Sequence, residues 1–118
     1  MNDSRTVIIG LDGVPFEMVR TLCEMDVMPC TRELIKHGVF KTMCSSIPEV
    51  SSVAWSSMIT GKNPGEHGIF GFMDLFENSY KMRFPDFRDL KSRPFWDEWG
   101  GKSVIINVPS TYPVREMS

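Results

Sequence analysis

The sequence predicts an α/β fold whose mostly parallel sheet, flanked by helices, is incomplete within these 118 residues. Two apolar runs, TVIIGLDG at 6–13 and KSVIINVP at 102–109, do not alternate between apolar and polar residues. Such runs are typical of strands buried on both faces, as in a parallel sheet. Segments with helical spacing lie between the two runs, which is the order expected of a βαβ unit.

Two helices are predicted after the first strand. The first follows Pro15, because apolar residues recur at helical spacing from Phe16 to Cys23. The second spans 29–37; it starts at a proline, which needs no N–H donor in the first turn, and it stops before Gly38.

A third helix is expected at 53–60, ending at Gly61. Its apolar residues share one face, and these are Trp55, Met58 and Ile59.

The other segments carry weaker patterns. A roughly alternating run at 39–47 predicts a strand, and 62–68 is a turn-rich loop. Residues 69–89 have no clean period, so irregular structure or an edge hairpin is expected there. A short helix is predicted within 93–101, before two glycines. Because two parallel strands make a poor complete sheet, residues 1–118 are expected to be the N-terminal part of a single larger domain.

Composition and charge exclude several classes of protein. The 13 basic and 15 acidic residues are well mixed and give a net charge of -2, so no nucleic-acid-binding surface is expected. No apolar run is long enough to span a membrane, and the N-terminal run is too short for a signal peptide. A cytoplasmic protein is expected, with its three cysteines (Cys23, Cys30 and Cys44) free and mostly buried.

Asp12 is the first candidate functional residue. It follows the first predicted strand directly, and ligands of open α/β sheets bind outside the carboxyl ends of strands. A carboxylate there could hold a metal ion. The alternative, left open by the spacing, is that Asp12 only caps the next helix or shapes the turn with Gly13.

Ser51 and Ser52 lie at the predicted start of the third helix. A serine there is a favoured N-cap, which is the structural alternative. The functional alternative uses the N–H groups of the first turn, which bind anions and would place a hydroxyl beside a phosphate. A serine becomes a nucleophile only when a base or a metal lowers its pKa, and a metal is favoured here. His67 is expected to be a structural loop histidine and His37 a surface residue.

Four segments occur in the order VIIGLDGVPFEMV, MPCTRELIKHGVF, IPEVSSVAWSSMITGKNPGEHGIFGF and FWDEWGGKSVIINVPSTYP. In this order they resemble the N-terminal part of the type I phosphodiesterase/nucleotide pyrophosphatase family of the alkaline phosphatase superfamily. The resemblance covers nearly the whole chain. It implies an alkaline-phosphatase-like catalytic domain and a two-metal phosphohydrolase with a covalent phospho-enzyme step.

The resemblance also implies roles for particular residues. Asp12 matches the metal ligand after the first strand. The nucleophile of the family lies nine residues before the threonine of the Thr-Gly pair, and counting back from Thr60 gives Ser51. Ser51 would also ligate the metal, and the backbone amide of Ser52 would contact the substrate. Two divalent ions, zinc or manganese, are the implied cofactors.

The sequence departs from the family pattern at several places. Ala54 stands where the nucleotide pyrophosphatases carry an asparagine that holds the phosphate, so their substrate cannot be transferred. The remaining metal ligands are absent, since neither His37 nor His67 matches one. The prediction is therefore a metal-dependent phosphodiesterase or phosphatase, acting on a small phosphorylated substrate, of which this chain supplies only part of the site. A non-catalytic truncated binding module and a phosphomutase of the same superfamily remain alternatives.

Overall fold

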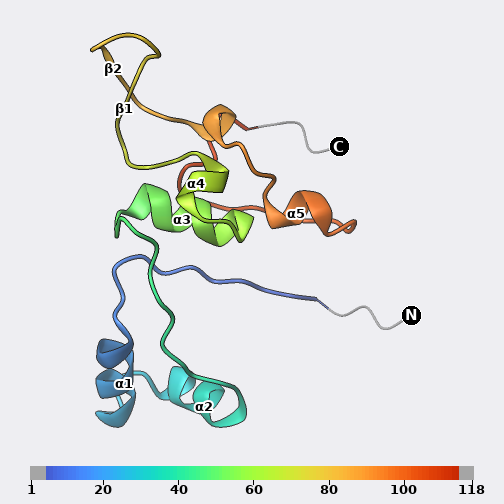
Figure 1. Ribbon diagram of the computed structural model, residues 1–118. Coiled ribbons are helices and arrows are strands. Elements are labelled where there is room, and N and C mark those ends of the chain that lie inside the picture. Colours follow the sequence, from blue (N-terminus) through green and yellow to red (C-terminus); the bar gives the residue numbers. More distant parts are fainter. Residues whose placement is uncertain (1–4, 115–118) are drawn as a thin grey trace. The chain divides into compact units, whose positions relative to one another are not determined.

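The structure is a computed structural model that describes residues 5–114. Its contacts divide the chain into two units, unit 1 (Met1–Cys44) and unit 2 (Ser45–Ser118). Figure 1 shows the elements of each unit along the chain.

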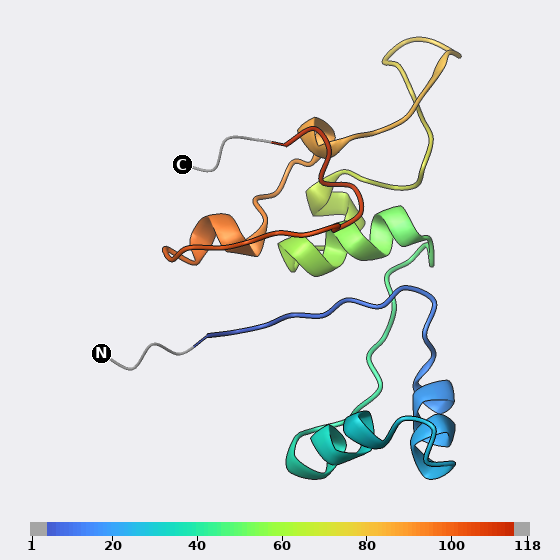
Figure 2. The same cartoon turned by 180° about the vertical axis from the view of Figure 1, so that it is seen from behind.

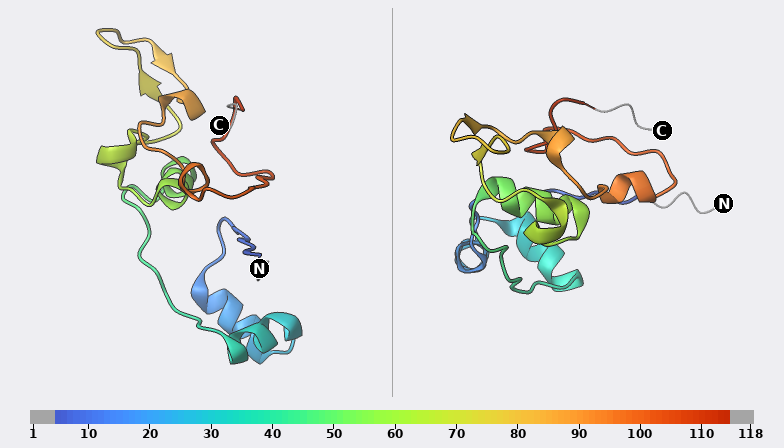
Figure 3. Two further views of the ribbon diagram at one scale, coloured as in Figure 1. Left: turned by 90° about the vertical axis from the view of Figure 1, so that its right-hand side faces the viewer. Right: turned by 45° about the horizontal axis from the view of Figure 1, so that its top comes forward.

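Unit 1 consists of two short helices. Helix α1 spans Phe16–Glu24 and α2 spans Pro29–His37, as the apolar spacing and the prolines predicted. The two helices pack against each other (Figure 3), and Cys23 of α1 is buried. The ring of Phe16 stacks on that of Phe40, with centroids 4.2 Å apart, so the segment after α2 is held against the start of α1.

Unit 2 contains the other helices and a small hairpin. In chain order its elements are α3 (Ser51–Thr60), α4 (Pro64–His67), β1 (Asp74–Leu75), β2 (Met82–Arg83), the 3-10 helix η1 (Phe87–Asp89) and α5 (Phe95–Glu98). Gly61 ends α3 in the left-handed region, with φ of 64°, and its N–H donates to the carbonyl of Ser57. A glycine adopts this conformation without the penalty that a Cβ atom brings, which explains the stop.

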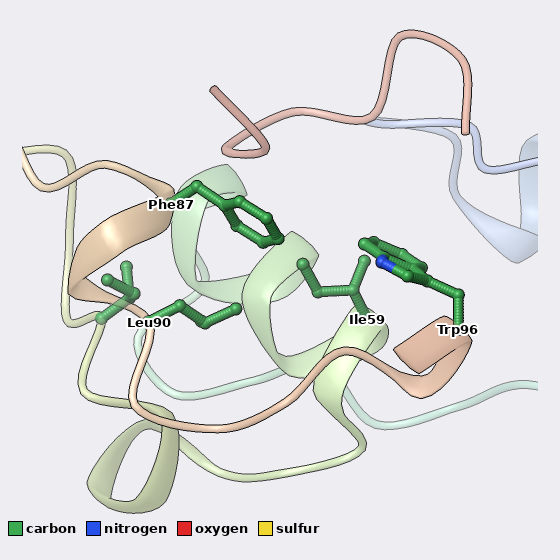
Figure 4. Close-up of a cluster of buried hydrophobic side chains, with 5 residues drawn as sticks. Ile59, Phe87, Leu90 and Trp96 are labelled. Carbon is green, nitrogen blue, oxygen red and sulfur yellow. The ribbon is translucent and has the colours of Figure 1, made fainter. Parts of the chain in front are cut away.

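The core of unit 2 gathers around Ile59 on α3. Figure 4 shows its side chain between Trp96 from α5 and Phe87 from η1, with Leu90 nearby. Ile69 completes this buried cluster, and residues from the extended segment 102–108 pack against it. In Figure 2 this segment runs past α3, so the core joins parts of the chain that are far apart in sequence.

Strands β1 and β2 form an antiparallel hairpin in which Asp74 lies opposite Arg83. The guanidinium of Arg83 pairs with Asp74 at 3.1 Å and with Asp89 of η1 at 2.5 Å. Both hydrogen bonds keep the base of the hairpin next to η1, while its tip extends away from α3 and α4 (Figures 1 and 2). The expectation of irregular structure or an edge hairpin at 69–89 is confirmed.

The described residues combine helices with one small antiparallel sheet, which is consistent with a fragment of an α/β domain, and the mostly parallel sheet stays a prediction. The segments 6–13, 39–47 and 102–109 contain no strand. A strand needs a hydrogen-bonded partner, and the described part of the chain provides none for them. Many of their apolar side chains are correspondingly exposed, 79% for Val7 and 83% for Val104, whereas Ile105 and Val108 are partly buried against the core of unit 2.

The prediction that the cysteines are mostly buried needs correction, and the buried face of α3 differs from the apolar face that the sequence indicates. The buried face of α3 carries Ser52, Val53, Ser56 and Ile59, whereas Met58 is exposed. The amphipathic pattern failed because the buried face contains two serines, which hydrophobic periodicity counts as polar. The cysteines are free, as expected, but Cys30 and Cys44 are exposed and only Cys23 is buried.

Across residues 5–114, none of the helices has the length and apolar character that crossing a bilayer requires.

Candidate active site at the start of helix α3

Helix α3 begins without a side-chain cap. Its N-cap residue is Val50, in an extended conformation with φ of −121° and ψ of 136°, and Ser51 is the first helical residue. The alternative in which a serine serves as the N-cap is therefore wrong. The two serines are inside the first turn, where their hydroxyls are not needed to begin the helix.

Two backbone N–H groups at this end are free. The carbonyl of Val50 accepts from the N–H groups of Val53 and Ala54, both at 2.9 Å. Within residues 5–114, the N–H groups of Ser51 and Ser52 donate to no acceptor. Together with the positive end of the helix dipole, such groups favour an anion.

The five hydroxyls of α3 are not equivalent. Ser56 Oγ donates to the carbonyl of Ser52 at 2.7 Å, and Thr60 Oγ1 donates to that of Ser56 at 2.6 Å. Ser57 Oγ lies 3.0 Å from Nε2 of His67. The hydroxyls that remain outside any hydrogen bond of the described residues are those of Ser51 and Ser52, at the end with the free N–H groups.

Ser51 and Ser52 differ in accessibility because successive helical residues are turned by about 100°. Ser51 is half-buried, so its hydroxyl is open to a ligand. Ser52 is only 5% exposed, and its Oγ is buried without a hydrogen-bond partner among residues 5–114. The nucleophile predicted by the nine-residue spacing is thus also the more accessible of the pair.

His67 ends α4 and is fully buried. Its Nδ1 accepts from the N–H of Ile69 at 3.1 Å, so in the neutral ring the proton is on Nε2. Nε2–H then donates to Ser57 Oγ. Burial lowers the pKa of His67 below its ordinary value, with Glu66 acting weakly in the opposite direction, and this favours the neutral ring.

This tautomer decides what His67 can do. A general base needs an unprotonated nitrogen facing the hydroxyl, and the only such nitrogen of His67 is taken by a backbone N–H. The pair of Ser57 and His67 is therefore a structural link between α3 and α4, although a serine and a histidine at this distance resemble a nucleophile with its base. The structural role predicted for His67 agrees with these contacts.

Asp12 lies in unit 1, in a turn with Gly13, whose φ is 66°. Its carboxylate is exposed and takes no part in any hydrogen bond or ion pair found among the described residues. It does not cap α1, whose N-cap is Pro15. Ser51 belongs to unit 2, so the meeting of Asp12 and Ser51 at one metal stays a prediction.

A complete metal site is not found in the part of the chain that the structure describes, because no three His, Cys, Asp or Glu side chains converge there. His37, at the end of α2, is exposed, and both ring nitrogens of His67 are engaged. The residues present therefore do not by themselves fit a two-metal centre, which needs a full set of ligands.

Sequence patterns missed one feature beside these residues. A pocket of about 130 Å³ opens on the buried face of α3, with Ser52 and Ser56 in its wall. Its other wall residues come from 69–72 and 84–90 and from Ser110, which have no common period or motif. In the sequence, only the four-residue spacing of Ser52 and Ser56, which puts them on one face of α3, could have indicated that polar side chains lie on the buried face.

No significant match was found among curated proteins or among solved structures. The model of one protein family, described as type I phosphodiesterase / nucleotide pyrophosphatase, matches residues 6–114. That range takes in Asp12, both serines at the start of α3 and His67. With nearly its whole length matched, this chain belongs to the type I phosphodiesterase/nucleotide pyrophosphatase family, a hydrolase family of the alkaline phosphatase superfamily.

Proposed function

We propose that this chain supplies the nucleophile, Ser51, of a metal-dependent hydrolase that cleaves phosphate monoesters or diesters through a covalent phosphoserine. One observation carries the proposal: Ser51 opens α3 with a half-buried hydroxyl outside every hydrogen bond of residues 5–114. A phosphate held there would accept from the free N–H groups of Ser51 and Ser52. Membership of a hydrolase family supports the assignment.

In the proposed reaction, the Ser51 hydroxyl gives up its proton and Oγ forms a bond to phosphorus while the bond from phosphorus to the leaving oxygen breaks. The leaving alcohol takes up a proton. Water then cleaves the phosphoserine, releasing phosphate or a phosphate monoester and restoring the serine hydroxyl. The N–H of Ser52 is assigned as a donor to a phosphoryl oxygen in both steps, where negative charge develops.

The proposed cofactors are two divalent metal ions, zinc or manganese, with Asp12 and Ser51 among their ligands. When bound, such ions lower the pKa of a ligated hydroxyl and neutralise charge on phosphoryl oxygens. Two ligands are too few for two ions, so the others are proposed to come from polypeptide outside these 118 residues. The chain would then be the N-terminal part of one catalytic domain, inactive alone. The cytoplasmic location expected from the sequence stays a prediction.

The test uses this chain together with the polypeptide that completes the metal ligands, supplied with zinc or manganese. The preparation should hydrolyse p-nitrophenyl phosphate esters. Ser51→Ala should lower kcat/KM by at least about a thousandfold, because no other described hydroxyl replaces the nucleophile. Ser51→Thr should keep measurable activity, since it keeps the hydroxyl, and mass spectrometry of acid-quenched reactions should find the phosphoryl group on the peptide that contains Ser51.

Ser46→Ala is the control. Its hydroxyl donates to the carbonyl of Pro48 in an exposed loop, so its loss should leave kcat/KM within about twofold. A larger loss from Ser52→Ala than from Ser51→Ala would show that the nucleophile was assigned to the wrong serine. Tight phosphate binding without hydrolysis would indicate a non-catalytic module instead, and return of the phosphoryl group to substrate rather than to water would indicate a phosphomutase.

A further inference from the structure

The pocket on the buried face of α3 lies entirely within unit 2. Ser52 and Ser56 of α3 form one part of its wall, and Leu90 of the core forms another. The exposed rings of Phe72 and Phe84 belong to the wall as well. Its volume, about 130 Å³, is close to that of a protein cavity of roughly 150 Å³ that binds benzene.

Ser52 is the unusual member of this wall. Its Oγ is buried and has no hydrogen-bond partner in the described residues, whereas Ser56 Oγ is satisfied by a backbone carbonyl. An unpaired buried hydroxyl is unfavourable, and such groups are rare in folded proteins. A ligand that reaches this hydroxyl after a change of its χ1 rotamer would supply the missing partner.

The charge of the wall selects among ligands. Among the described wall residues, Asp86 is the only ionisable one and none is basic. Arg88 donates to both carboxylate oxygens of Asp86 and keeps its pKa below the ordinary value, so the carboxylate stays charged. The described wall offers an anion no free cationic partner, because Arg88 is already paired with Asp86, so an uncharged ligand is favoured over a phosphate.

We propose that this pocket binds a small, uncharged aromatic ring carrying a hydroxyl or amide group. The ring would lie against Phe72, Phe84 and Leu90, and its polar group would bond to Ser52 Oγ or to the Asp86 carboxylate. Because Ser51 and Ser52 are consecutive, the pocket is placed to hold the organic part of a phosphate ester whose phosphoryl group is at Ser51. This last assignment rests on the proposed function; the binding site does not.

The test is an NMR titration of the 118-residue chain with phenol, followed through the backbone amides of Ser52 and Gly71. Saturable shifts are expected, with a Kd of the order of 1 mM for so small a ligand. Ser52→Ala should weaken binding about three- to tenfold by removing a hydrogen bond. Phe84→Ala should weaken it by a similar factor, since the exposed ring can be removed without disturbing the core.

Two matched variants serve as controls. Ser103→Ala and Phe76→Ala make the same chemical changes in unit 2 outside the pocket wall, and both should leave the Kd within about twofold. Benzoate, a ring of the same size with a negative charge, should bind at least about tenfold more weakly than phenol.

The proposal would be overturned if phenol gave no saturable shifts at these amides, or if neither Ser52→Ala nor Phe84→Ala weakened binding. It would also fail if benzoate bound as tightly as phenol. The readout needs neither metal nor hydrolysis. A chain that binds phenol in this way but never yields an active hydrolase would refute the proposed function and leave the pocket as assigned.

Discussion

His67 shows how a residue can carry the signs of a catalytic group and still be structural. It is buried, it has a lowered pKa, and a serine hydroxyl lies 3.0 Å away. These are the features by which active-site bases are recognised. The decisive contact is the one on the other side of the ring, where the N–H of Ile69 occupies Nδ1 and leaves no free lone pair for Ser57.

The lowered pKa of His67 predicts how stability depends on pH. The folded state keeps the ring neutral, whereas the unfolded chain binds a proton below its ordinary pKa of 6.5. The unfolded state therefore binds more protons in this range, so the free energy of unfolding should fall as pH is lowered below about 6.5. Urea unfolding of the 118-residue chain between pH 7.5 and 5 measures this slope.

Two substitutions isolate the contribution of His67. His67→Gln should have a lower free energy of unfolding than the wild type at pH 7. Between pH 7 and 5 that free energy should change much less than in the wild type, because glutamine does not titrate. His37→Gln, at an exposed position on α2, should keep the wild-type slope. The carboxyl groups of Asp86 and Asp89 have pKa values lowered from 3.8 by Arg88 and Arg83, so they act only in more acidic solution. A slope that persists in His67→Gln would contradict this account.

At the scale of elements, the bounds of α2 and the end of α3 were predicted from the sequence, whereas the start of α3, the helix α4 within the predicted loop at 62–68 and the buried face of α3 were not. Prolines and glycines mark the ends of α2 and α3 through local backbone chemistry, which needs no tertiary structure. The buried face depends on what the rest of unit 2 places against α3. Serine satisfies its own hydroxyl by donating to the carbonyl four residues earlier, as Ser56 does, and can then be buried like a small apolar residue.

The choice of Ser51 as the candidate nucleophile needs only a count along the chain and stays a prediction, whereas the pocket beside Ser52 could not be predicted from the sequence. Phe72, Phe84 and Ser110 meet α3 through loops whose paths no periodic pattern specifies. The free N–H groups at the helix start are an intermediate case. The sequence predicted a helix there, and the structure added that Val50, which has no side-chain oxygen, is the N-cap.

The buried hydroxyl of Ser52, which has no hydrogen-bond partner among the described residues, should lower the free energy of unfolding of the chain. Ser52→Ala should raise the free energy of unfolding of the 118-residue chain by about 0.5–2 kcal/mol, because it removes a buried unsatisfied group and improves helix propensity. Ser56→Ala is the matched control on the same face. It brings the same gain in propensity but deletes a 2.7 Å hydrogen bond, so its net change should be smaller or destabilising. If urea titration showed that Ser52→Ala lowers the free energy of unfolding more than Ser56→Ala does, the hydroxyl of Ser52 would have a hydrogen-bond partner in solution, which would contradict this account.

At the scale of the whole molecule, the apolar sequence of segments 6–11 and 102–108 disagrees with their exposed, unpaired conformation among the described residues. They carry the β-rich apolar runs of buried strands, yet Val7, Ile9, Val104 and Ile106 are all about 80% exposed. Exposing so many β-branched residues is unfavourable, and an extended chain without ladder partners leaves its N–H groups to water. The sequence pattern is that of a sheet interior, and the described residues provide neither the neighbouring strands nor the helices to cover them.

Hydrogen exchange can test whether these segments become strands when the proposed domain is complete. In the 118-residue chain, the amides of 6–11 and 102–108 should exchange quickly, because none of them donates to a backbone acceptor in the structure as described, whereas amides in the middle of α3 should be protected. When the chain is joined to the polypeptide that completes the metal ligands, exchange in both segments should slow by at least about a hundredfold, as expected for central strands. The amide of Tyr80, in the β1–β2 hairpin, donates to no acceptor among the described residues, so it should remain unprotected in both states and serves as the internal control. If the two segments stayed unprotected in an active preparation, the alkaline-phosphatase-like parallel sheet would be the wrong architecture for this chain, even with Ser51 as its nucleophile.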